Sequence, residues 1–335
     1  GLELAPDDVR FILLLAQAEI RLNNISAAET QTNALLESHG GNQDLRLSLA
    51  QLYLEEGHPE PAQRLLQPLI GQPEVPNLAY YLLGAITQTQ GDTDNALLYY
   101  RQVSEGDEFV PARAAAAQML IEEDRLLDAR AFLRIERMRF DSYFTELVML
   151  EVQLLDETNQ AEEANALLDR EITRTPDDAS LLYMRAMRRW EAGDIAGMEA
   201  DLRQVLRTDP DNAEALNALG YTLADLNLPG RLQEAFELIE RAYEADPDNP
   251  AVLDSMGWVY FRLGQPDEAL PWLESAYTQL PDQEVAAHLA EVLQALGREE
   301  EARRLIEQIM QRTNLHPQID DLLKRYPELT PQAIP

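Results

Sequence analysis

The amino-acid sequence predicts an all-α protein in which similar pairs of antiparallel helices are stacked one after another as a solenoid. Small residues recur at two fixed places of a unit of about 34 residues, apolar residues recur at helical spacing, and glycine or proline interrupts the pattern between helices. A solenoid grows by adding units and needs no second core, so one array is expected to cover nearly all of the 335 residues.

The clearest copy of the unit is PAVLDSMGWVYFRLGQPDEALPWLESAYTQLPD, residues 250–282. Residues from Gly264 to Pro266 break the chain in its middle, and Pro281 ends it with a residue that cannot continue a helix. Each half has one face of apolar and small residues at helical spacing, namely Leu253, Gly257 and Tyr260 in the first half and Ala269, Leu273 and Ala276 in the second. The stretch is therefore expected to form a helical hairpin.

Further copies are predicted along an array over residues 9–316, which begin near Val9, Gln43, Asn77, Val110, Thr145, Ala179, Ala213, Pro250 and Gln283. Position 8 of these copies holds Ala16, Ala50, Gly84, Ala117, Val152, Ala186, Gly220, Gly257 and Ala290. Position 20 holds Ala28, Ala62, Ala96, Ala129, Ala164, Met198, Ala235, Ala269 and Ala302. Small side chains are needed at these two positions because the two helix backbones of a hairpin come closest there.

Three segments depart from the repeat. Residues 1–8 are expected to form a short polar lead with Asp7 as a possible helix cap, and residues 317–335 a capping helix with an apolar face, followed by a tail. An enlarged loop is expected between the helices of the seventh copy, at Asn227, Leu228, Pro229 and Gly230. The lack of an initiator methionine and of an N-terminal cap suggests a fragment of a longer protein.

The repeat resembles the tetratricopeptide repeat. The consensus positions 4, 7, 8, 11, 20, 24, 27 and 32, counted from Pro250, are filled by Leu253, Met256, Gly257, Tyr260, Ala269, Leu273, Ala276 and Pro281. The resemblance implies a right-handed superhelix of about nine hairpins with a C-terminal capping helix. It also implies a non-enzymatic scaffold or adaptor whose ligand is a protein, bound on the concave face.

A narrower resemblance covers most of the chain and is carried by the run from NALGYTLADLN, residues 217–227, to EVAAHLAEVLQALG, residues 284–297. It is similar to the C-terminal half of the repeat lipoproteins of gamma-proteobacterial envelopes. Among these it most resembles an outer-membrane lipoprotein that binds a periplasmic carboxyl-terminal processing protease and presents cell-wall hydrolases to it. The resemblance implies a periplasmic adaptor whose lipidated cysteine lies upstream of Gly1.

The composition narrows the classes of partner. Sixty acidic residues against 27 basic ones give a formal charge of −33, which makes nucleic acid a poor partner. The acidity is typical of solvated outer faces, and an acidic docking groove for a basic partner is the alternative. No stretch is long enough to span a membrane, so no direct membrane insertion is expected, and the absence of cysteine excludes disulfides and thiolate ligands.

No catalytic pattern is present. The sequence contains no G-x-S-x-G, no phosphate-binding loop, no H-E-x-x-H and no glycine-rich dinucleotide turn. His288 stands in a helical run, where it is expected to be a surface or packing residue rather than a ligand. We therefore expect no enzyme activity, no cofactor, no metal and no small-molecule substrate.

The resemblance places groove residues on the first helix of each hairpin, at positions 2, 5, 9 and 12 or 13. Aromatic side chains there are typical binding anchors, while acidic ones steer association. Trp258 and Tyr221 are the preferred anchors, whereas Trp190 and Phe261 have packing against the next hairpin as an equal alternative. The candidate protein-binding residues are Tyr183, Met187, Trp190, Asn217, Tyr221, Asp225, Asp254, Trp258 and Phe261, with Tyr81 as the candidate of the N-terminal half.

Two other functions stay open. The array is alternatively an accessory domain of a larger enzyme, or a structural protein that self-associates through its concave face or its cap. A cytoplasmic location is the alternative to the periplasm. The clamp by which some repeats of this kind hold a peptide carboxylate is not expected, because Lys324 is the only lysine and no cations cluster on the groove positions.

Overall fold

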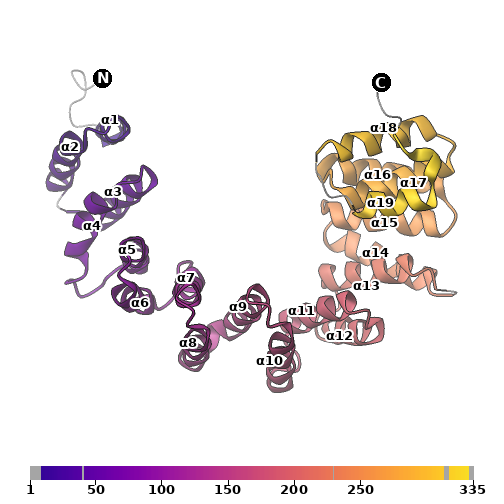
Figure 1. Ribbon diagram of the computed structural model, residues 1–335, viewed down its shortest axis with the longest axis horizontal. Coiled ribbons are helices and arrows are strands. Elements are labelled where there is room, and N and C mark those ends of the chain that lie inside the picture. The colour runs from indigo at the N-terminus through magenta and orange to yellow at the C-terminus, as the bar shows by residue number, and fades with distance from the viewer. Residues whose placement is uncertain (1–8, 40, 229, 313–316, 332–335) are drawn as a thin grey trace. The chain divides into compact units, whose positions relative to one another are not determined.

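The computed structural model describes residues 9–39, 41–228, 230–312 and 317–331, and all regular structure within these ranges is helical (Figure 1). The predicted all-α fold of stacked hairpins is confirmed. The predicted lead at residues 1–8, with Asp7, lies outside the described residues. By contact, the chain divides into unit 1, residues 1–167, and unit 2, residues 168–335, which are described separately.

Unit 1 contains successive helical hairpins. Its α-helices are α1 (Val9–Arg21), α2 (Ile25–Ser38), α3 (Gln43–Glu55), α4 (Pro59–Leu66), α5 (Asn77–Thr89), α6 (Thr93–Gln102), α7 (Phe109–Glu122), α8 (Leu126–Arg139) and α9 (Phe144–Glu157), and α10 (Ala161–Arg174) crosses the boundary between the units. Two 3₁₀ turns follow α4 and α8, η1 (Gln67–Leu69) and η2 (Asp141–Tyr143). Each odd-numbered helix up to α7 packs against the helix that follows it.

Unit 2 continues the same pattern and ends in a short helix. Its α-helices after α10 are α11 (Ala179–Glu191), α12 (Ile195–Thr208), α13 (Ala213–Asp225), α14 (Leu232–Ala245), α15 (Pro250–Arg262), α16 (Pro266–Gln279), α17 (Gln283–Ala295), α18 (Glu299–Met310) and α19 (Pro317–Arg325), followed by the 3₁₀ turn η3 (Pro327–Leu329). The pairs α11–α12, α13–α14, α15–α16 and α17–α18 form hairpins.

Two helices start one residue before the expected repeat starts. The copies expected to begin near Val110 and Thr145 correspond to α7, which starts at Phe109, and α9, which starts at Phe144. The enlarged loop between α13 and α14 runs from Leu226 to Arg231. Pro229, one of the residues expected there, lies outside the described residues.

The hairpins are held at the spacing that small side chains allow. At Gly257 of α15, an added Cβ would lie 2.5 Å from Cγ of Leu273 and 3.1 Å from the carbonyl oxygen of Ala269, both on α16. The first distance is shorter than real Cβ contacts and the second is tight, so a side chain at this crossing would force Leu273 or the backbone of α16 to move. The predicted reason for a small residue at this position is thus seen directly in the backbone spacing.

Unit 1 contains an ion pair that is fully buried. The guanidinium of Arg113 on α7 donates to Oε2 of Glu136 on α8 at 2.7 Å, and both side chains are inaccessible to solvent. The same guanidinium donates to the carbonyl oxygens of Tyr100 and Val103, at 3.0 and 2.6 Å, where α6 ends. It also lies 4.0 Å from the ring centre of Phe109. Arg113 therefore fixes the end of α6 relative to α8, with Glu136 as its counter-charge and the two carbonyl oxygens as acceptors of its remaining N–H groups.

The short helix α19 covers the apolar edge of the last hairpin. Ile319 and Leu322 are buried and belong to the same apolar cluster as Leu305 and Ile309 of α18. Outside this apolar contact, Arg325 forms an ion pair with Glu291 of α17 at 2.7 Å. The helix thus occupies the place that a further hairpin would take.

No helix within the described residues is long and apolar enough to cross a membrane.

Replacing Gly257 by leucine is expected to destabilise unit 2. The new side chain would overlap Leu273, and overpacking of this kind lowers the free energy of unfolding by about 1–3 kcal/mol. Gly71→Leu is the matched control, because no atom lies within 4 Å of the Cβ added at Gly71. Urea unfolding of the two variants measures the difference, and equal loss in both would refute the close crossing.

Truncating Leu322 to alanine is expected to loosen the last hairpin before the rest of the chain. A buried leucine reduced to alanine costs about 2–5 kcal/mol, and in a solenoid the loss is felt first by the neighbouring unit. Relative to the wild type, the variant should show faster amide hydrogen exchange in α17 and α18, and a smaller change or none in α11 and α12. Gln318→Ala, at an exposed position of the same helix, should leave the exchange unchanged.

Candidate functional site

The first helices of the hairpins in unit 2, α11, α13, α15 and α17, carry the candidate residues on what we call the first-helix face. Each of these helices starts after an aspartate or asparagine whose side chain accepts a hydrogen bond from a backbone N–H of the first turn. The capping residues are Asp178, Asn212, Asn249 and Asp282. Such caps fix where each helix begins and therefore which side chains its face presents.

A buried charge pair joins α15 and α17. Nδ1 of His288 lies 2.9 Å from Oδ2 of Asp254, and both side chains are buried. The other ring nitrogen, Nε2, lies 3.5 Å from the hydroxyl of Tyr221 on α13, and that hydroxyl donates to Oε1 of Glu284 at 2.6 Å. Three successive first helices are thus connected through polar side chains.

Trp258 forms the apolar centre of this cluster. Its ring stacks on the imidazole of His288 with 4.0 Å between ring centres, and its Nε1 donates to Oδ1 of Asp225 at 3.2 Å. The guanidinium of Arg262 lies 5.0 Å from the ring centre, within the range of a cation–π contact. Arg262 also donates to the carbonyl oxygen of Ala224, which caps the end of α13.

The burial shifts two pKa values. Burial lowers the pKa of His288, but the charge of Asp254 and the hydrogen bond to it raise the pKa more, so the net shift is upward from 6.5. Burial raises the pKa of Tyr221, and the nearby charge of Glu284 raises it further. The imidazole therefore favours the charged form that pairs with Asp254, while the phenol remains protonated at neutral pH.

Two of the predicted surface residues are buried, and the expectation of exposure was wrong for them. Trp258 is only 3% exposed and Asp254 only 5%. The cause is α17, whose His288 covers both side chains. Asp254 is therefore not a free surface charge, and removing Trp258 would disturb packing as well as any binding surface. The expectation that His288 is a packing residue fits its buried position.

The remaining candidates of unit 2 are more accessible. Trp190 is 49% exposed, so of the two alternatives for this residue the structure favours the exposed one. Asp225 is also exposed, whereas Phe261 is half-buried, with its ring centre 5.4 Å from that of Trp258. The other candidates on the face, Tyr183, Met187, Asn217 and Tyr221, are half-buried. Oδ1 of Asn217 is buried and accepts no hydrogen bond from the described residues.

Tyr81 belongs to unit 1 and is not part of this cluster. It lies on α5, is half-buried, and packs with its ring centre 6.0 Å from that of Tyr100. Its side chain contributes to two neighbouring apolar clusters.

Sequence reasoning missed Glu284 and Arg262 as members of the site. Glu284 stands at position 2 of its copy, one of the groove positions that the repeat pattern indicates, so the signal for it was present. Arg262 stands at position 13 of its copy, which is also a groove position. His288 stands at position 6, where the pattern gives no indication of a groove residue.

The cluster contains three carboxylates and one imidazole, yet within the described residues no group of three or more such side chains is arranged to hold a metal ion. The carboxylates of Asp225, Asp254 and Glu284 each accept a hydrogen bond from a different neighbour, namely Trp258, His288 and Tyr221. Their arrangement connects the first helices to one another.

The hairpins, their small-residue crossings and the capping helix define an α-solenoid of the helical-repeat class. A family profile described as tetratricopeptide repeat matches residues 35–314, and the chain belongs to this family. Members of the family generally mediate protein–protein interactions and are typically non-catalytic.

A protein of Pseudomonas aeruginosa PAO1, whose name says that it contains TPR repeats, is 38% identical over 213 residues. The match covers 64% of this chain and 36% of the relative, so this chain spans about a third of that protein's length. Among solved structures, a thermophilic TPR protein of Thermus thermophilus is similar with a TM-score of 0.46 and 21% identity, covering 55% of this chain and 98% of that one. PilF of Pseudomonas aeruginosa is similar with a TM-score of 0.44 and 18% identity, covering 55% and 85%.

The pair of His288 and Asp254 predicts a pH dependence of stability. Because the folded-state pKa of His288 lies above that of the unfolded chain, its stabilisation is present below about pH 6.5 and is lost as pH rises through the folded-state pKa. The melting temperature of the wild type should therefore fall more than that of His288→Gln between about pH 6 and about pH 9. His58→Gln, at the start of α4, should follow the wild type. Parallel curves for wild type and His288→Gln would contradict the assigned charge pair.

Proposed function

We propose that this chain is a non-catalytic scaffold that binds a protein on the first-helix face of unit 2. In the more specific form of the proposal, the partner is a periplasmic carboxyl-terminal processing protease, to which the scaffold presents cell-wall hydrolases. The chain would then be the adaptor part of an outer-membrane lipoprotein whose lipidated N-terminus precedes Gly1. Support comes from the family, from the resemblance of residues 217–297 to such lipoproteins, and from the relative that is 38% identical.

One observation carries the proposal, which is the 49% exposure of the large aromatic side chain of Trp190 on α11. Exposed large aromatic side chains bury much area on binding and lose little conformational entropy, which makes them effective anchors. Asn217 adds a carbonyl oxygen without a hydrogen-bond donor among the described residues. A partner that inserts a donor there would satisfy a group that is otherwise buried unpaired.

A fixed framework supports the same proposal. Tyr221, Glu284 and His288 connect α13, α15 and α17. The side chains of these three helices are therefore held in place before a partner binds. Preorganisation of this kind leaves more of the contact energy for affinity. Asp225 supplies negative charge at the edge of the face, which would favour a basic patch on the partner.

The test uses the carboxyl-terminal processing protease of the same organism as the binding partner of the purified chain. Trp190→Ala should weaken binding by about 1–3 kcal/mol, because it removes an exposed anchor without creating a cavity. Asp225→Asn should instead slow association and reduce its salt dependence, since it removes the charge but keeps an acceptor for Trp258. Leu280→Ala, an exposed apolar residue at the end of α16, is the matched control.

Surface plasmon resonance at two salt concentrations separates the two effects into the dissociation and association rates. Absence of any binding would refute the protease as the partner. Binding that survives Trp190→Ala and Asp225→Asn unchanged would show that the docking surface lies elsewhere, and Tyr81 of unit 1 would then be the next candidate.

A further inference from the structure

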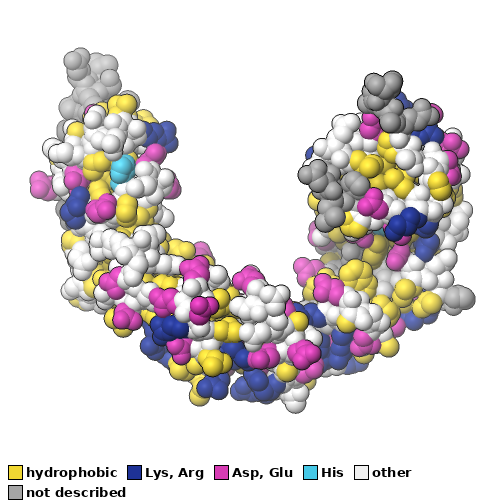
Figure 2. Space-filling model, in the orientation of Figure 1, with side chains coloured by type: hydrophobic (Ala, Val, Ile, Leu, Met, Phe, Trp, Pro, Cys, Tyr) yellow, Lys and Arg dark blue, Asp and Glu magenta, His cyan; other side chains and the backbone are white. Residues whose placement is uncertain are grey.

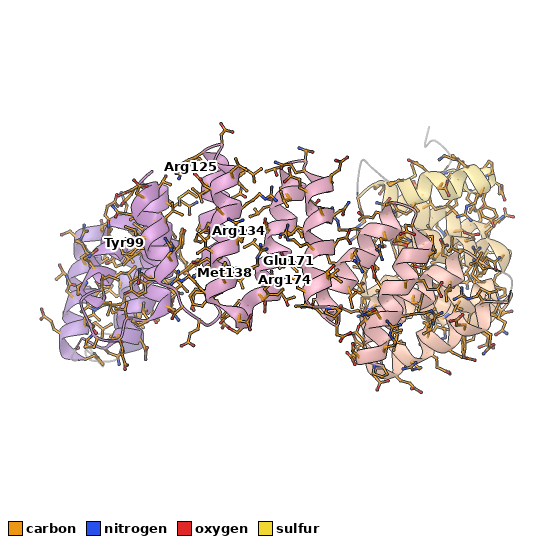
Figure 3. The ribbon with its side chains drawn as sticks, turned by 90° about the horizontal axis from the view of Figure 1, so that it is seen from below. Tyr99, Arg125, Arg134, Met138, Glu171 and Arg174 are labelled. Carbon is orange, nitrogen blue, oxygen red and sulfur yellow. The ribbon has the colours of Figure 1, made fainter. Side chains whose placement is uncertain are left out.

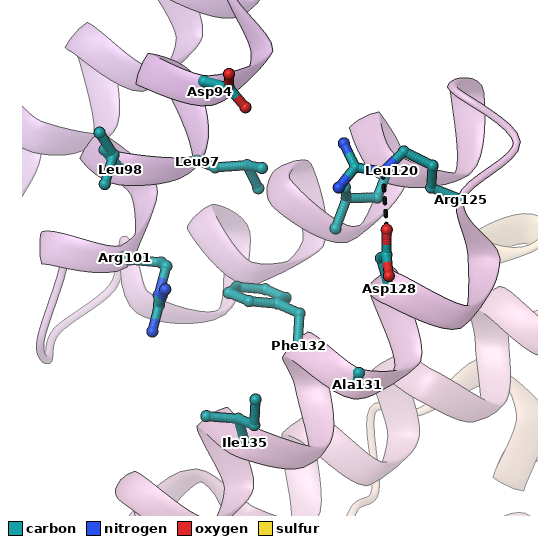
Figure 4. Close-up of a pocket in the computed structure, with 10 residues that line it drawn as sticks. All are labelled: Asp94, Leu97, Leu98, Arg101, Leu120, Arg125, Asp128, Ala131, Phe132 and Ile135. Atoms are coloured by element: carbon teal, nitrogen blue, oxygen red, sulfur yellow. Dashed lines mark hydrogen bonds and ion pairs between the residues drawn. The ribbon is translucent and has the colours of Figure 1, made fainter.

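Unit 1 has a hollow between the second helices of two successive hairpins, α6 and α8. Its volume is about 510 Å³. Figure 4 shows Leu97 of α6 and Phe132 of α8 directed into the space between the helices, with Arg101 and Ile135 at its edge. The hollow lies mainly between second helices, with Leu120 of α7 and Arg125 also in its lining, and it belongs to unit 1, whereas the first-helix face was defined in unit 2. We call it the α6/α8 hollow.

The lining residues of each helix fall on one face. They are Asp94, Leu97, Leu98 and Arg101 on α6, and Asp128, Ala131, Phe132 and Ile135 on α8. In both helices the spacing is i, i+3, i+4 and i+7, so the hollow follows the helices for two turns. Its walls are mainly apolar and its charged residues stand at the ends of these faces.

Several apolar side chains at or near the hollow are exposed in the described part of the chain. Leu98 is 58% exposed and Met138, one helical turn beyond Arg134 on α8, is 82% exposed. Other hairpins have polar residues at the place of Leu98, such as Glu237 in α14 and Arg304 in α18. Exposure of a contiguous apolar surface is costly for a protein in water and indicates a covered interface.

The hollow is lined by both signs of charge, Asp94 and Asp128 beside Arg101 and Arg125, in a chain that is strongly acidic as a whole. Arg101 and Arg134 are exposed, and neither forms an ion pair within the described part of the chain. Arg125 and Arg139 are also near, but they pair with Asp128 and Glu136. Figure 2 shows arginine and hydrophobic side chains next to one another over α6 and α8, and Figure 3 shows Arg134 and Met138 on the same face of α8. Arg101 in the lining and Arg134 beside it thus outnumber Asp94, the acidic lining residue for which the described residues provide no ion pair, and leave a small excess of positive charge next to the hollow.

The hollow is also built to keep its width. Arg113 on α7 holds the last carbonyl groups of α6 and the carboxylate of Glu136 on α8 at once. The two walls are thereby fixed through one buried guanidinium.

We propose that the α6/α8 hollow docks an acidic, amphipathic helical segment of a protein partner. Apolar residues of that helix at i, i+3 or i+4, and i+7 would contact Leu97, Leu98 and Phe132. Its carboxylates would pair with Arg101 and Arg134, which have no partner in the described part of the chain. A bilayer surface fits less well, because the site is hollowed rather than flat and the whole chain would be repelled by anionic lipids.

The experiment selects ligands without assuming a partner. A display library of roughly 14-residue peptides, about four helical turns, is selected on the purified full-length chain and counter-selected on the double variant Leu98→Gln, Ile135→Gln. The peptides that prefer the wild type should be amphipathic and acidic. Fluorescence anisotropy of the best peptide should show an affinity loss of about tenfold or more in this double variant and in Arg101→Glu, Arg134→Glu.

The matched controls are Leu280→Gln and Arg304→Glu, which change an exposed leucine and an exposed arginine of unit 2 and should leave peptide affinity unchanged. Because all the substituted side chains of the α6/α8 hollow are exposed, the melting temperatures should remain those of the wild type. If the glutamine pair lowers the melting temperature, Leu98→Ala with Arg134→Ala takes its place.

Three results would overturn the proposal. The first is a selection that yields no peptide able to distinguish wild type from the double variant, or only basic or non-amphipathic peptides. The second is a change of oligomeric state in the same variants by light scattering, which would assign the hollow to a second copy of the chain. The third is a loss of binding to phosphatidylglycerol vesicles in these variants, which would assign it to a membrane surface.

Discussion

The close approach of two helix backbones within each hairpin is the constraint on which the structure depends. Gly257 has no space for a side chain beside Leu273 and Ala269, and the same position is small in nearly every copy. Where two helices can approach this closely, the remaining residues of their faces interdigitate and bury a continuous apolar layer. One hairpin exposes the other side of that layer, so each must be covered by the next, and α19 covers the last.

The helical hairpins could be predicted from the sequence because the residues that determine them lie close together in the chain. Positions 8 and 20 lie within a single copy, and the first helices start within one residue of the expected repeat starts. The burial of Trp258 and Asp254 was not predictable in this way, because it depends on His288 of the following copy, at a position that is not a groove position in the repeat. The repeat pattern describes the residues of one copy. It does not specify which side chains of the next copy will cover them.

The α6/α8 hollow illustrates the same limit. The helical spacing of Leu97, Leu98 and Arg101 is visible in the sequence, but the distance between two second helices is set by their neighbours, above all by Arg113 and Glu136. Arginine suits this role because its planar group forms several hydrogen bonds at once, which an ammonium group cannot do in the same geometry. The docking site that we propose in unit 1 therefore lies on second helices, whereas the repeat pattern directs attention to the first helices.

The hydrogen bond from Tyr221 to Glu284 has a mechanical consequence. It joins α13 to α17 across the intervening hairpin, whereas the contacts of an ideal solenoid connect only adjacent units. An array in which only adjacent hairpins are in contact can bend at every interface between hairpins. The bond from Tyr221 to Glu284 spans two such interfaces and opposes bending at both. Under a stretching force, the hairpins from α13 to α18 should therefore extend as one stiff block, and unit 2 should deform more easily near α11 and α12.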